Sequence, residues 1–270
     1  MATTGPLANK VIIITGSSMG IGKTMARKMA RAGAHVVLNG RNKQRLQQAR
    51  EALSAEGYEM LAVPGDVSSV EDCKALIEAT LAQYGQIDVL VNNAGISMEG
   101  TVESLNPEVF RKVMDVNVLG SVYPTQQALP ALKASKGSVI FIGSVAGIRG
   151  IPNYAAYSAS KMALTALAES MKIELAEAGV HVGLAYVGFT ENDPQKTIYD
   201  AQGRIVPQPK RDFIKAESPE RVAERIITMI QRRRFKQVFT PLGKLNAFMN
   251  RWLPGVVGTI LKRNYYKQKG

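Results

Sequence analysis

Tyr157 and Lys161, four positions apart in a 270-residue chain, are a residue pair whose types and spacing can transfer protons. They lie in the stretch YSASKMALTALAESMKIELAEAG, which predicts a helix, and residues i and i+4 of a helix share one face. A free phenol has a pKa of about 10, but a neighbouring ammonium lowers it towards the range useful for general acid–base catalysis. Ser144 follows the apolar run SVIFIG and can hydrogen-bond a substrate oxygen on which charge develops. A Tyr-x-x-x-Lys pair is also common on exposed helices, so the surrounding elements must bring these side chains together.

Those elements alternate between short apolar runs and longer helical patterns. Strands are predicted in KVIIITG, HVVLNG, EMLAVPGDV, IDVLVNNAG, GSVIFIGS and VHVGLAYVG, each separated from the next by a predicted helix. Continuous Val/Ile runs suit strands that are buried on both faces, and intervening helices imply parallel strands. With right-handed crossovers, the pattern predicts an α/β fold: a single doubly wound Rossmann-type domain with a parallel sheet.

We expect residues 1–240 to form this dinucleotide-binding and catalytic domain, and residues 241–270 to form an amphipathic C-terminal extension. Residues 188–216 are polar with scattered prolines, which predicts a substrate loop or lid. A helix should follow at Pro219, with Ser218 as its N-cap.

The first predicted strand runs into TGSSMGIG, a glycine-rich turn that precedes a helix. Gly16 suits the tight turn after the strand, while Gly20 and Gly22 allow close approach of the backbone. A pyrophosphate could then lie against the exposed N–H groups and the positive dipole of the helix N-terminus. The turn therefore predicts a dinucleotide site.

The spacing Gly-x-x-x-Gly-x-Gly departs from the common Rossmann fingerprint and resembles the TGxxxGxG motif of the short-chain dehydrogenase/reductase family. The resemblance extends over residues 8–190 and includes Asp66–Val67, the NNAG sequence at Asn92–Gly95, Asn117, Ser144 and Tyr157-x-x-x-Lys161. It implies a catalytic set of Asn117, Ser144, Tyr157 and Lys161, in which Asn117 holds a water that relays protons to Lys161. One departure is Val187-Gly188, where the family usually has Pro-Gly.

The same resemblance implies a nicotinamide dinucleotide cofactor, with Asp66 and Val67 at the adenine and the NNAG segment steadying the strand beside it. The implied cofactor contacts are Gly16, Ser18, Met19, Gly20, Ile21, Gly22, Arg41, Asn42, Asp66, Val67, Asn93, Ala94, Gly95, Tyr157, Lys161, Gly188 and Thr190.

The end of the second predicted strand bears on the choice between NAD and NADP. NAD enzymes generally place an acidic residue there to bind the ribose 2′-hydroxyl. This chain has Asn39-Gly40-Arg41-Asn42 instead. A carboxylate would repel a 2′-phosphate, whereas the guanidinium of Arg41 can grip one through paired hydrogen bonds. The sequence therefore predicts NADP(H).

The few cysteine and histidine residues limit the disulfide and metal-binding chemistry that the chain can carry. Cys73 is the only cysteine, and His35 and His181 are the only histidines, so we expect neither a disulfide framework nor a metal site. Cys73 falls in a helical pattern and is expected to be a buried thiol. MATTGPLANK does not read as a signal peptide, so a cytoplasmic location is expected, with peripheral membrane association through the tail as an alternative.

The excess of positive over negative charge is confined to the C-terminal quarter. Residues 204–270 hold 16 Lys+Arg and 4 Asp+Glu (16 − 4 = +12), which equals the net charge of the whole chain, +12. An apolar stripe follows at three- and four-residue steps, and Pro254 should divide it into two helices. The stripe comprises Leu242, Leu245, Phe248, Met249, Trp252, Leu253, Val256, Val257, Ile260 and Leu261.

Two interpretations of this tail stay open. It packs against its own domain or a neighbouring subunit of a homo-oligomer, or it lies on an anionic membrane surface. Nucleic acid is not an expected partner, because large apolar side chains interrupt the basic residues. The tail resembles, in general character, the membrane-associated C-terminal segments of some hydroxysteroid dehydrogenases and ketosphinganine reductases in the family.

These features favour an NADP(H)-dependent oxidoreductase acting on a lipophilic ketone or secondary alcohol, such as a steroid, a ketosphinganine or a long-chain 3-oxoacyl compound. An alternative is a reductase of small soluble carbonyls whose tail serves dimerisation. A second is a non-catalytic NADP(H)-sensing protein, which the intact Ser144, Tyr157 and Lys161 argue against, because a sensor needs no proton-transfer residues.

Overall fold

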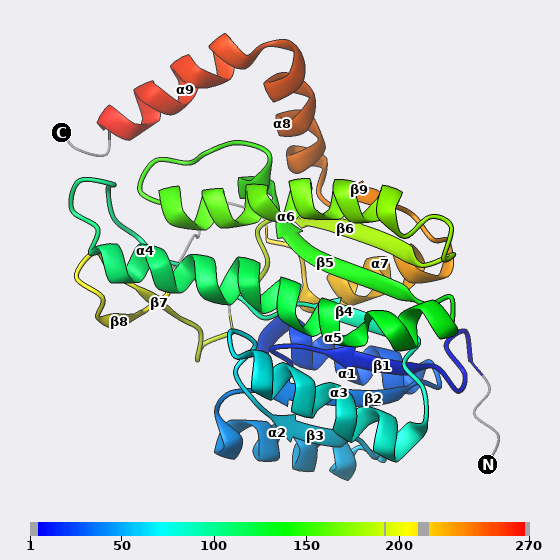
Figure 1. The fold of residues 1–270 in the computed structure, drawn as a ribbon. Coiled ribbons are helices and arrows are strands. Elements are labelled where there is room, and N and C mark those ends of the chain that lie inside the picture. Colours follow the sequence, from blue (N-terminus) through cyan, green and yellow to red (C-terminus); the bar gives the residue numbers. More distant parts are fainter. Residues whose placement is uncertain (1–4, 192, 210–215, 268–270) are drawn as a thin grey trace.

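The computed structural model describes residues 5–191, 193–209 and 216–267, and its centre is a seven-stranded sheet in the order β3-β2-β1-β4-β5-β6-β9 (Figure 1). All six neighbouring strand pairs are parallel. The strands are β1 (Val11–Ile14), β2 (His35–Gly40), β3 (Leu61–Pro64), β4 (Val89–Asn92), β5 (Ser138–Ser144), β6 (His181–Val187) and β9 (Lys236–Val238). This order confirms the predicted doubly wound fold.

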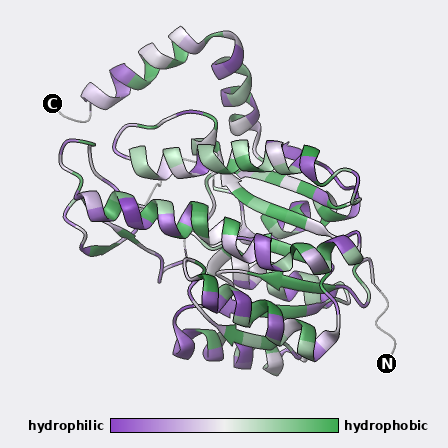
Figure 2. Ribbon diagram, viewed as in Figure 1, coloured by the Kyte–Doolittle hydropathy of each residue, from purple (hydrophilic) through white to green (hydrophobic). Residues whose placement is uncertain are grey.

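Helices cover both faces of the sheet, which explains why the central strands are continuous apolar runs. One face carries α1 (Gly20–Arg31), α2 (Lys43–Ala55) and α7 (Pro219–Gln231), and the other carries α3 (Val70–Tyr84), α5 (Gly120–Ala134) and α6 (Ala155–Glu174). Successive residues of β1 alternate between the two hydrophobic cores: Ile12 and Ile14 belong to the first and Ile13 to the second. Figure 2 shows the sheet as the most hydrophobic part of the ribbon.

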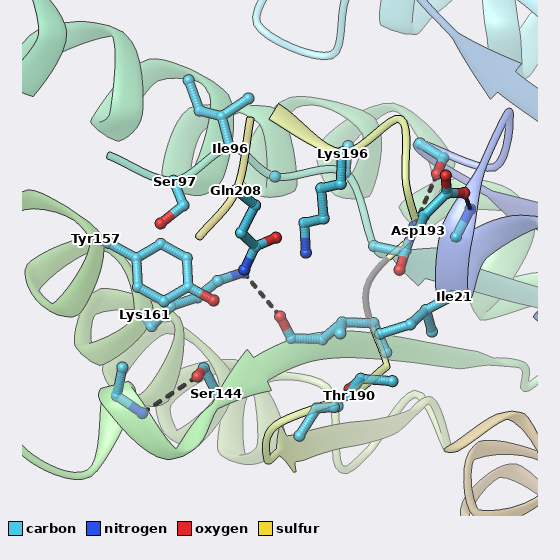
Figure 3. Close-up of a pocket in the computed structure, with 18 of the residues that line it drawn as sticks. Ile21, Ile96, Ser97, Ser144, Tyr157, Lys161, Thr190, Asp193, Lys196 and Gln208 are labelled. Atoms are coloured by element: carbon cyan, nitrogen blue, oxygen red, sulfur yellow. Dashed lines mark hydrogen bonds between the residues drawn. The ribbon is translucent and has the colours of Figure 1, made fainter. Parts of the chain in front are cut away.

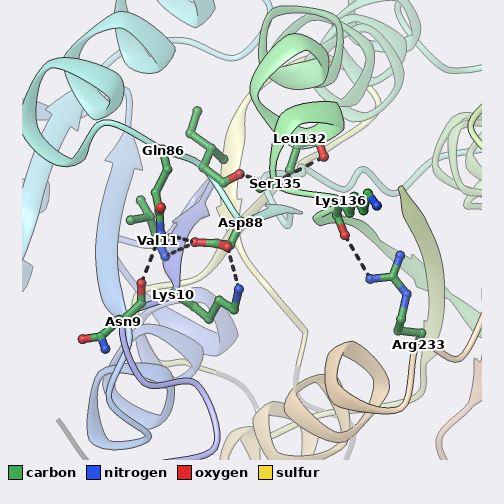
Figure 4. Close-up of polar contacts among 10 residues, drawn as sticks. Asn9, Lys10, Val11, Gln86, Asp88, Leu132, Ser135, Lys136 and Arg233 are labelled. Carbon is green, nitrogen blue, oxygen red and sulfur yellow. Dashed lines mark hydrogen bonds and ion pairs between the residues drawn. The ribbon is translucent and has the colours of Figure 1, made fainter. Parts of the chain in front are cut away.

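The strand order reverses between β1 and β4, because the chain leaves β1 towards β2 on one side and resumes at β4 on the other. Doubly wound sheets bind ligands at the carboxyl ends of the strands beside such a reversal. At the opposite end of the sheet, the buried Asp88 accepts hydrogen bonds from Lys10 Nζ (2.8 Å), Val11 N (2.9 Å) and Gln86 Nε2 (2.9 Å) (Figure 4). This carboxylate ties β1 to β4 and is fully used in doing so, which gives it a structural role.

The long helical region predicted before β5 is one run with a local defect. It divides into α4 (Pro107–Met114), a π-helical turn (Asp115–Leu119) and α5. Wide π turns inside α-helices are uncommon and often occur at functional sites. This one carries Asn117.

Two segments differ from the sequence-based expectation. The stretch predicted as an irregular loop, 188–216, contains the antiparallel pair β7 (Thr197–Tyr199) and β8 (Ile205–Pro207), although its residues 192 and 210–215 lie outside the described residues. The edge strand β9 was not predicted. All three strands have only three residues, too few to show an alternating pattern.

The C-terminal tail forms α8 (Pro241–Trp252) and α9 (Pro254–Lys267), separated at Pro254 as the sequence predicts. Thr240 caps α8 by accepting a hydrogen bond from Gly243 N (3.1 Å). Figure 1 shows α8 rising beside β9 and α9 passing above the rest of the molecule. None of the helices within the described ranges combines the length and the apolar character that a bilayer crossing requires.

Candidate active site

The glycine-rich turn between β1 and α1 needs its glycines for two different reasons. Gly16 and Gly20 have φ of +62° and +54°, in the left-handed region where a side chain is strained. At Gly22 the obstacle is space, since a Cβ there would lie 2.4 Å from the carbonyl oxygen of Gly16. The turn therefore keeps its backbone bare and close to the start of α1.

The N-terminus of α1 holds an anion in this structure. Gly20 N donates a hydrogen bond to Oδ2 of Asp193, a residue of the long loop after β6, at 3.0 Å. Met19 at the N-cap supplies no side-chain hydrogen bond, and the first turn contains no acidic residue. The terminal amides and the helix dipole thus remain available to negative charge from outside the helix. A carboxylate stands where a dinucleotide would place its pyrophosphate, so the turn fits such a group.

The NNAG segment supports this turn from β4. Asn93 Nδ2 donates to the carbonyl oxygens of Thr15 (2.9 Å) and Gly16 (3.0 Å). In return, the Thr15 hydroxyl accepts hydrogen bonds from Asn93 N (3.0 Å) and Ala94 N (3.1 Å). The family resemblance implied that this segment steadies the strand beside it; the hydrogen bonds show that it also holds the glycine-rich turn.

Ser144, Tyr157 and Lys161 come together from two elements (Figure 3). Ser144 ends β5, where its Oγ accepts a hydrogen bond from Ala146 N at 3.2 Å. Tyr157 and Lys161 lie in the first two turns of α6, with Lys161 Nζ 5.8 Å from the centroid of the tyrosine ring. Lys161 Nζ also donates to the carbonyl oxygen of Ile142 at 2.9 Å, which fixes the ammonium beside β5.

Burial acts strongly on the ionisation of Lys161. Burial lowers its pKa to about 8, and the nearby positive charge of Lys196 acts in the same direction. A lysine with this pKa can change its charge near neutral pH. A buried ammonium of this kind is a candidate for proton chemistry rather than for a solvated helix surface.

A cavity of about 930 Å³ joins the trio to the glycine-rich turn. All of the predicted cofactor contacts line it: Gly16, Ser18, Met19, Gly20, Ile21, Gly22, Arg41, Asn42, Asp66, Val67, Asn93, Ala94, Gly95, Tyr157, Lys161, Gly188 and Thr190. Ser144 lines it as well. Residues that are far apart in sequence thus face one space, which lies at the carboxyl ends of the strands.

Asn117 is the predicted site residue that does not line this cavity. It is fully buried, and its amide bonds both backbone groups of Ile96: Oδ1 accepts from Ile96 N (2.8 Å), and Nδ2 donates to Ile96 O (3.0 Å). Nδ2 also donates to Ser160 Oγ at 2.9 Å. The side chain therefore holds the segment after NNAG against α6, and the predicted water-holding role stays a prediction.

Cationic side chains gather at the end of β2. Arg41 and Asn42 line the cavity there, and so does Arg45, one helical turn later, which the sequence reasoning missed. The Asn42 side chain caps α2 by accepting from Arg45 N at 2.8 Å. Neighbouring Asn39 lines the same wall, and its buried Oδ1 has no hydrogen-bond partner in the described structure. An i, i+4 arginine after a strand was the available signal for Arg45.

Asp66 keeps its negative charge beside these cations. Burial acts to raise its pKa, but hydrogen bonds from the hydroxyl and backbone N–H of Ser68 and the charge of Arg41 outweigh burial, so the pKa is lowered. The carboxylate is occupied by this local turn, with Ser68 Oγ at 2.6 Å.

Gly188, the residue of the Val187-Gly188 pair that keeps the family pattern, has a packing role. A Cβ on Gly188 would lie 2.7 Å from Cγ2 of Thr240, the cap of α8. Gly188 therefore allows the close approach of the tail to β6, and its contact with a cofactor stays a prediction. Thr190 Oγ1 donates to Gly188 O at 3.4 Å and faces the cavity.

Residues from two further segments complete the lining and were not predicted. Lys196 and Gln208 come from the loop after β6, and Leu261, Asn264 and Tyr265 come from α9. The sequence predicted a substrate loop or lid at 188–216, but the individual residues of this loop and of α9 that face the cavity depend on the tertiary fold.

The described residues contain no group of three or more His, Cys, Asp or Glu side chains placed to hold a metal ion. Cys73 is buried as expected, and burial raises the pKa of its thiol to about 12, so it remains protonated at neutral pH.

The geometry agrees with the comparison to known families. A model of the short chain dehydrogenase family matches residues 10–203. A Drosophila melanogaster protein named dehydrogenase/reductase SDR family protein 7-like is 35% identical over 232 residues, covering 84% of this chain and 71% of the relative. An Arabidopsis thaliana protein named 11-beta-hydroxysteroid dehydrogenase-like 2 is 36% identical over 232 residues, covering 84% of this chain and 72% of the relative. The chain belongs to the short-chain dehydrogenase family, and it is an oxidoreductase of the hydride-transferring type.

Solved structures show the same fold. A Burkholderia phymatum short chain dehydrogenase/reductase in complex with NAD superposes with a TM-score of 0.80 at 25% identity, covering 93% of this chain and 94% of that one. A metagenomic short-chain oxidoreductase in complex with NADP gives a TM-score of 0.72 at 28% identity, covering 87% and 98%.

Proposed function

We propose that this protein reduces a ketone, or oxidises the corresponding secondary alcohol, with NADP(H) as the redox partner. The observation that carries the proposal is the single cavity that Ser144, Tyr157 and Lys161 share with the glycine-rich turn at the start of α1. Such a cavity can hold a carbonyl substrate at one end and a dinucleotide at the other. A protein that only sensed the cofactor would not need the proton-transfer residues.

When bound, a reduced nicotinamide supplies a hydride to the carbonyl carbon. The Tyr157 hydroxyl donates its proton to the carbonyl oxygen, which becomes the alcohol. The Ser144 hydroxyl donates a hydrogen bond to that oxygen and stabilises the charge that develops on it. The Lys161 ammonium favours the phenolate that Tyr157 becomes, and Tyr157 regains a proton before the next turnover.

Arg41 and Arg45 are proposed to hold the 2′-phosphate that distinguishes NADP from NAD. Both line the cavity at the end of β2, and residues 38–42 contain no acidic side chain. Guanidinium groups match phosphate oxygens through paired hydrogen bonds. A metagenomic member of the family and a Thermococcus sibiricus alcohol dehydrogenase were solved with NADP and with 5-hydroxy-NADP, which is consistent with this choice.

We propose that the substrate is lipophilic and that the C-terminal tail binds an anionic membrane surface. The exposed apolar side chains of α8 and α9 are Leu242, Leu245, Phe248, Trp252, Leu253, Val256, Ile260 and Tyr266. The same segment, 241–270, carries basic residues and no acidic one. Apolar side chains beside cations are typical of helices that lie in the headgroup region of anionic bilayers. The steroid-dehydrogenase names of several relatives also favour a lipophilic substrate.

The test of the chemistry is Tyr157→Phe, with Tyr123→Phe as the matched control outside the cavity. Loss of the phenolic proton should leave NADPH binding intact and lower kcat for ketone reduction by about 10²–10⁴-fold. Tyr123→Phe should retain both. Turnover near the wild-type level in Tyr157→Phe would show that another group donates the proton.

A further inference from the structure

Helix α9 has two unlike faces. Val257 is buried and Leu261 and Tyr265 are half-buried, at i, i+4 and i+8, so one face is turned to the body of the protein. Ile260 and Tyr266 are 50% and 61% exposed on the other. The division follows from the helical period and separates neighbours of the same chemistry, Leu261 from Ile260 and Tyr265 from Tyr266.

The inward face reaches the reactive cavity. Leu261, Asn264 and Tyr265 line the same space as Ser144, Tyr157 and Lys161, although more than a hundred residues separate Tyr265 from Tyr157 in sequence. This part of the wall joins two apolar or aromatic side chains to one amide. It suits a substrate with a lipophilic body that extends beyond the reacting carbonyl.

A set of hydrogen bonds fixes α9 in this position. Arg149, in the segment that follows Ser144, donates through Nη1 to Asn250 Oδ1 (2.7 Å) and to Pro254 O (3.1 Å). Asn250 Nδ2 donates to Ile148 O at 3.1 Å. At the start of α8, a Cβ on Gly243 would lie 2.9 Å from Cγ1 of Val145. The junction of α8 and α9 is therefore attached to the connection between β5 and α6, the two elements that carry the catalytic trio.

We infer that α9 is a wall of the substrate site and that Leu261 and Tyr265 determine specificity for bulky lipophilic ketones. The Arg149–Asn250 pair acts as the positioning contact for this wall. The inference rests on the proposed function and deepens it: the helix that presents an apolar, basic face to the outside also contacts the body of the substrate on its inner face.

The experiment compares a small and a large ketone in the full-length protein. Cyclohexanone and 5α-androstane-3,17-dione serve as probes, with initial rates of NADPH oxidation giving kcat and KM. Leu261→Ala and Tyr265→Ala should each raise KM for the large ketone by about tenfold, the scale of one buried apolar side chain. KM for cyclohexanone and the Kd of NADPH should stay within about twofold, since the inference places neither ligand against α9.

The matched controls are Ile260→Ala and Tyr266→Ala, which remove the same amount of side chain from the outward face. These two variants should leave KM and kcat for both ketones unchanged. Tyr265→Phe keeps the aromatic ring. It should therefore have the wild-type KM for the large ketone, because the proposed contribution of Tyr265 is packing. Asn250→Ala should raise KM for the large ketone without lowering kcat for cyclohexanone, because it displaces α9 and leaves Ser144, Tyr157 and Lys161 in place.

Three outcomes overturn the inference. Equal effects of the inward and outward variants would mean that α9 acts only through general stability. If Leu261→Ala and Tyr265→Ala leave KM for the large ketone unchanged, α9 is not a wall of the substrate site. If the wild type reduces cyclohexanone but neither binds nor reduces the large ketone, bulky lipophilic ketones are excluded as substrates. If the wild type reduces neither probe, the proposed function fails, and equilibrium dialysis of the large ketone with the NADP-loaded variants alone decides the role of α9.

Discussion

Lys161 shows at the residue scale how burial converts an ordinary side chain into a reactive one. Its ammonium is enclosed among α6, β5 and the loop after β6, and both burial and the charge of Lys196 lower its pKa to about 8. Solvent would hold the same group charged to a pKa of about 10.4. The proposed proton-transfer site would therefore depend on a charge that Lys161 loses at moderately alkaline pH.

This shift predicts an alkaline limit on reduction. The ammonium is lost as pH rises through about 8, so kcat/KM for ketone reduction should fall above that value. Lys196→Gln removes the repelling charge, raises the pKa of Lys161 and should move the fall to higher pH. The control is Lys172→Gln, because Lys172 is exposed on α6, the helix that carries Lys161, and this variant should leave the pH profile unchanged. The measurement is kcat/KM from initial rates of NADPH oxidation between about pH 6 and pH 10. If the pH at which kcat/KM has fallen by half is the same in Lys196→Gln as in the wild type, the fall does not report the ionisation of Lys161.

Arg41 sets a second residue-scale prediction, on cofactor choice. Arg41→Ala should cost NADPH about 1.5–3 kcal/mol of binding free energy and cost NADH far less, since only NADPH carries the 2′-phosphate. Arg45→Ala should act in the same direction. Arg50→Ala, exposed on α2 outside the cavity, should change neither. Dissociation constants from nucleotide fluorescence titrations check this, and equal affinities of the wild type for both cofactors would defeat the NADP assignment.

At the scale of elements, the loop after β6 is more than a cover. It contains the β7–β8 pair, places Lys196 and Gln208 in the cavity wall and sends Asp193 to the N-terminus of α1. Tyr199 ties the loop to α4, with Lys112 Nζ 5.0 Å from its ring centroid. Because Asp193 occupies an amide that a pyrophosphate would use, we expect binding of the cofactor and the position of this loop to be coupled.

The coupling predicts that Asp193 weakens cofactor binding. Asp193→Asn keeps the size of the side chain but removes its charge, so NADPH should bind about two- to tenfold more tightly, the scale of one charge at a helix terminus. Asp200→Asn, in the same loop but paired with Arg204 at 2.6 Å, is the matched control. Isothermal titration with NADPH measures both variants. Weaker binding in Asp193→Asn would show instead that the carboxylate helps to build the site.

At the scale of the whole molecule, charge and apolar surface are distributed unevenly. The sheet and its six flanking helices bury most large apolar side chains, whereas α8 and α9 leave theirs exposed beside basic residues. Trp252, the single tryptophan, is 65% exposed. A surface of this kind is unusual on a monomer in water and indicates a partner.

We expect the full-length protein to co-sediment with anionic phosphatidylserine-containing vesicles more strongly than with phosphatidylcholine vesicles. Each basic residue near such a surface contributes about 1 kcal/mol, and salt should weaken only this part of the binding. Truncation after Thr240, or the milder Trp252→Ser with Phe248→Ser, should abolish vesicle binding, and the double variant should keep NADPH binding. If the full-length protein stays in the supernatant at low salt, packing between subunits is the better explanation, and sedimentation equilibrium would then show an oligomer that the double variant dissociates.

The sequence alone determined the alternation of strands and helices, the glycine-rich turn, the positions of Ser144, Tyr157 and Lys161 and the break at Pro254. These features are local: the period of a buried strand, the backbone freedom of glycine and the i, i+4 geometry of a helix are properties of neighbouring residues. The doubly wound class of the fold followed as well, because crossover handedness leaves few alternatives, whereas the edge strand β9 was not predicted.

Only the tertiary structure decided which distant residues share the cavity. The sequence predicted a substrate loop at 188–216, but not that Asp193 would reach the start of α1 or that Lys196 would lie near Lys161. It also did not predict that Tyr265 of α9 would line the same cavity as Ser144, Tyr157 and Lys161. The tertiary structure also separated Asn117, which bonds the Ile96 backbone, from the lining it was expected to join. Burial, the pKa of Lys161 and the two faces of α9 depend on what packs against each group, and packing between distant segments is set by the whole fold.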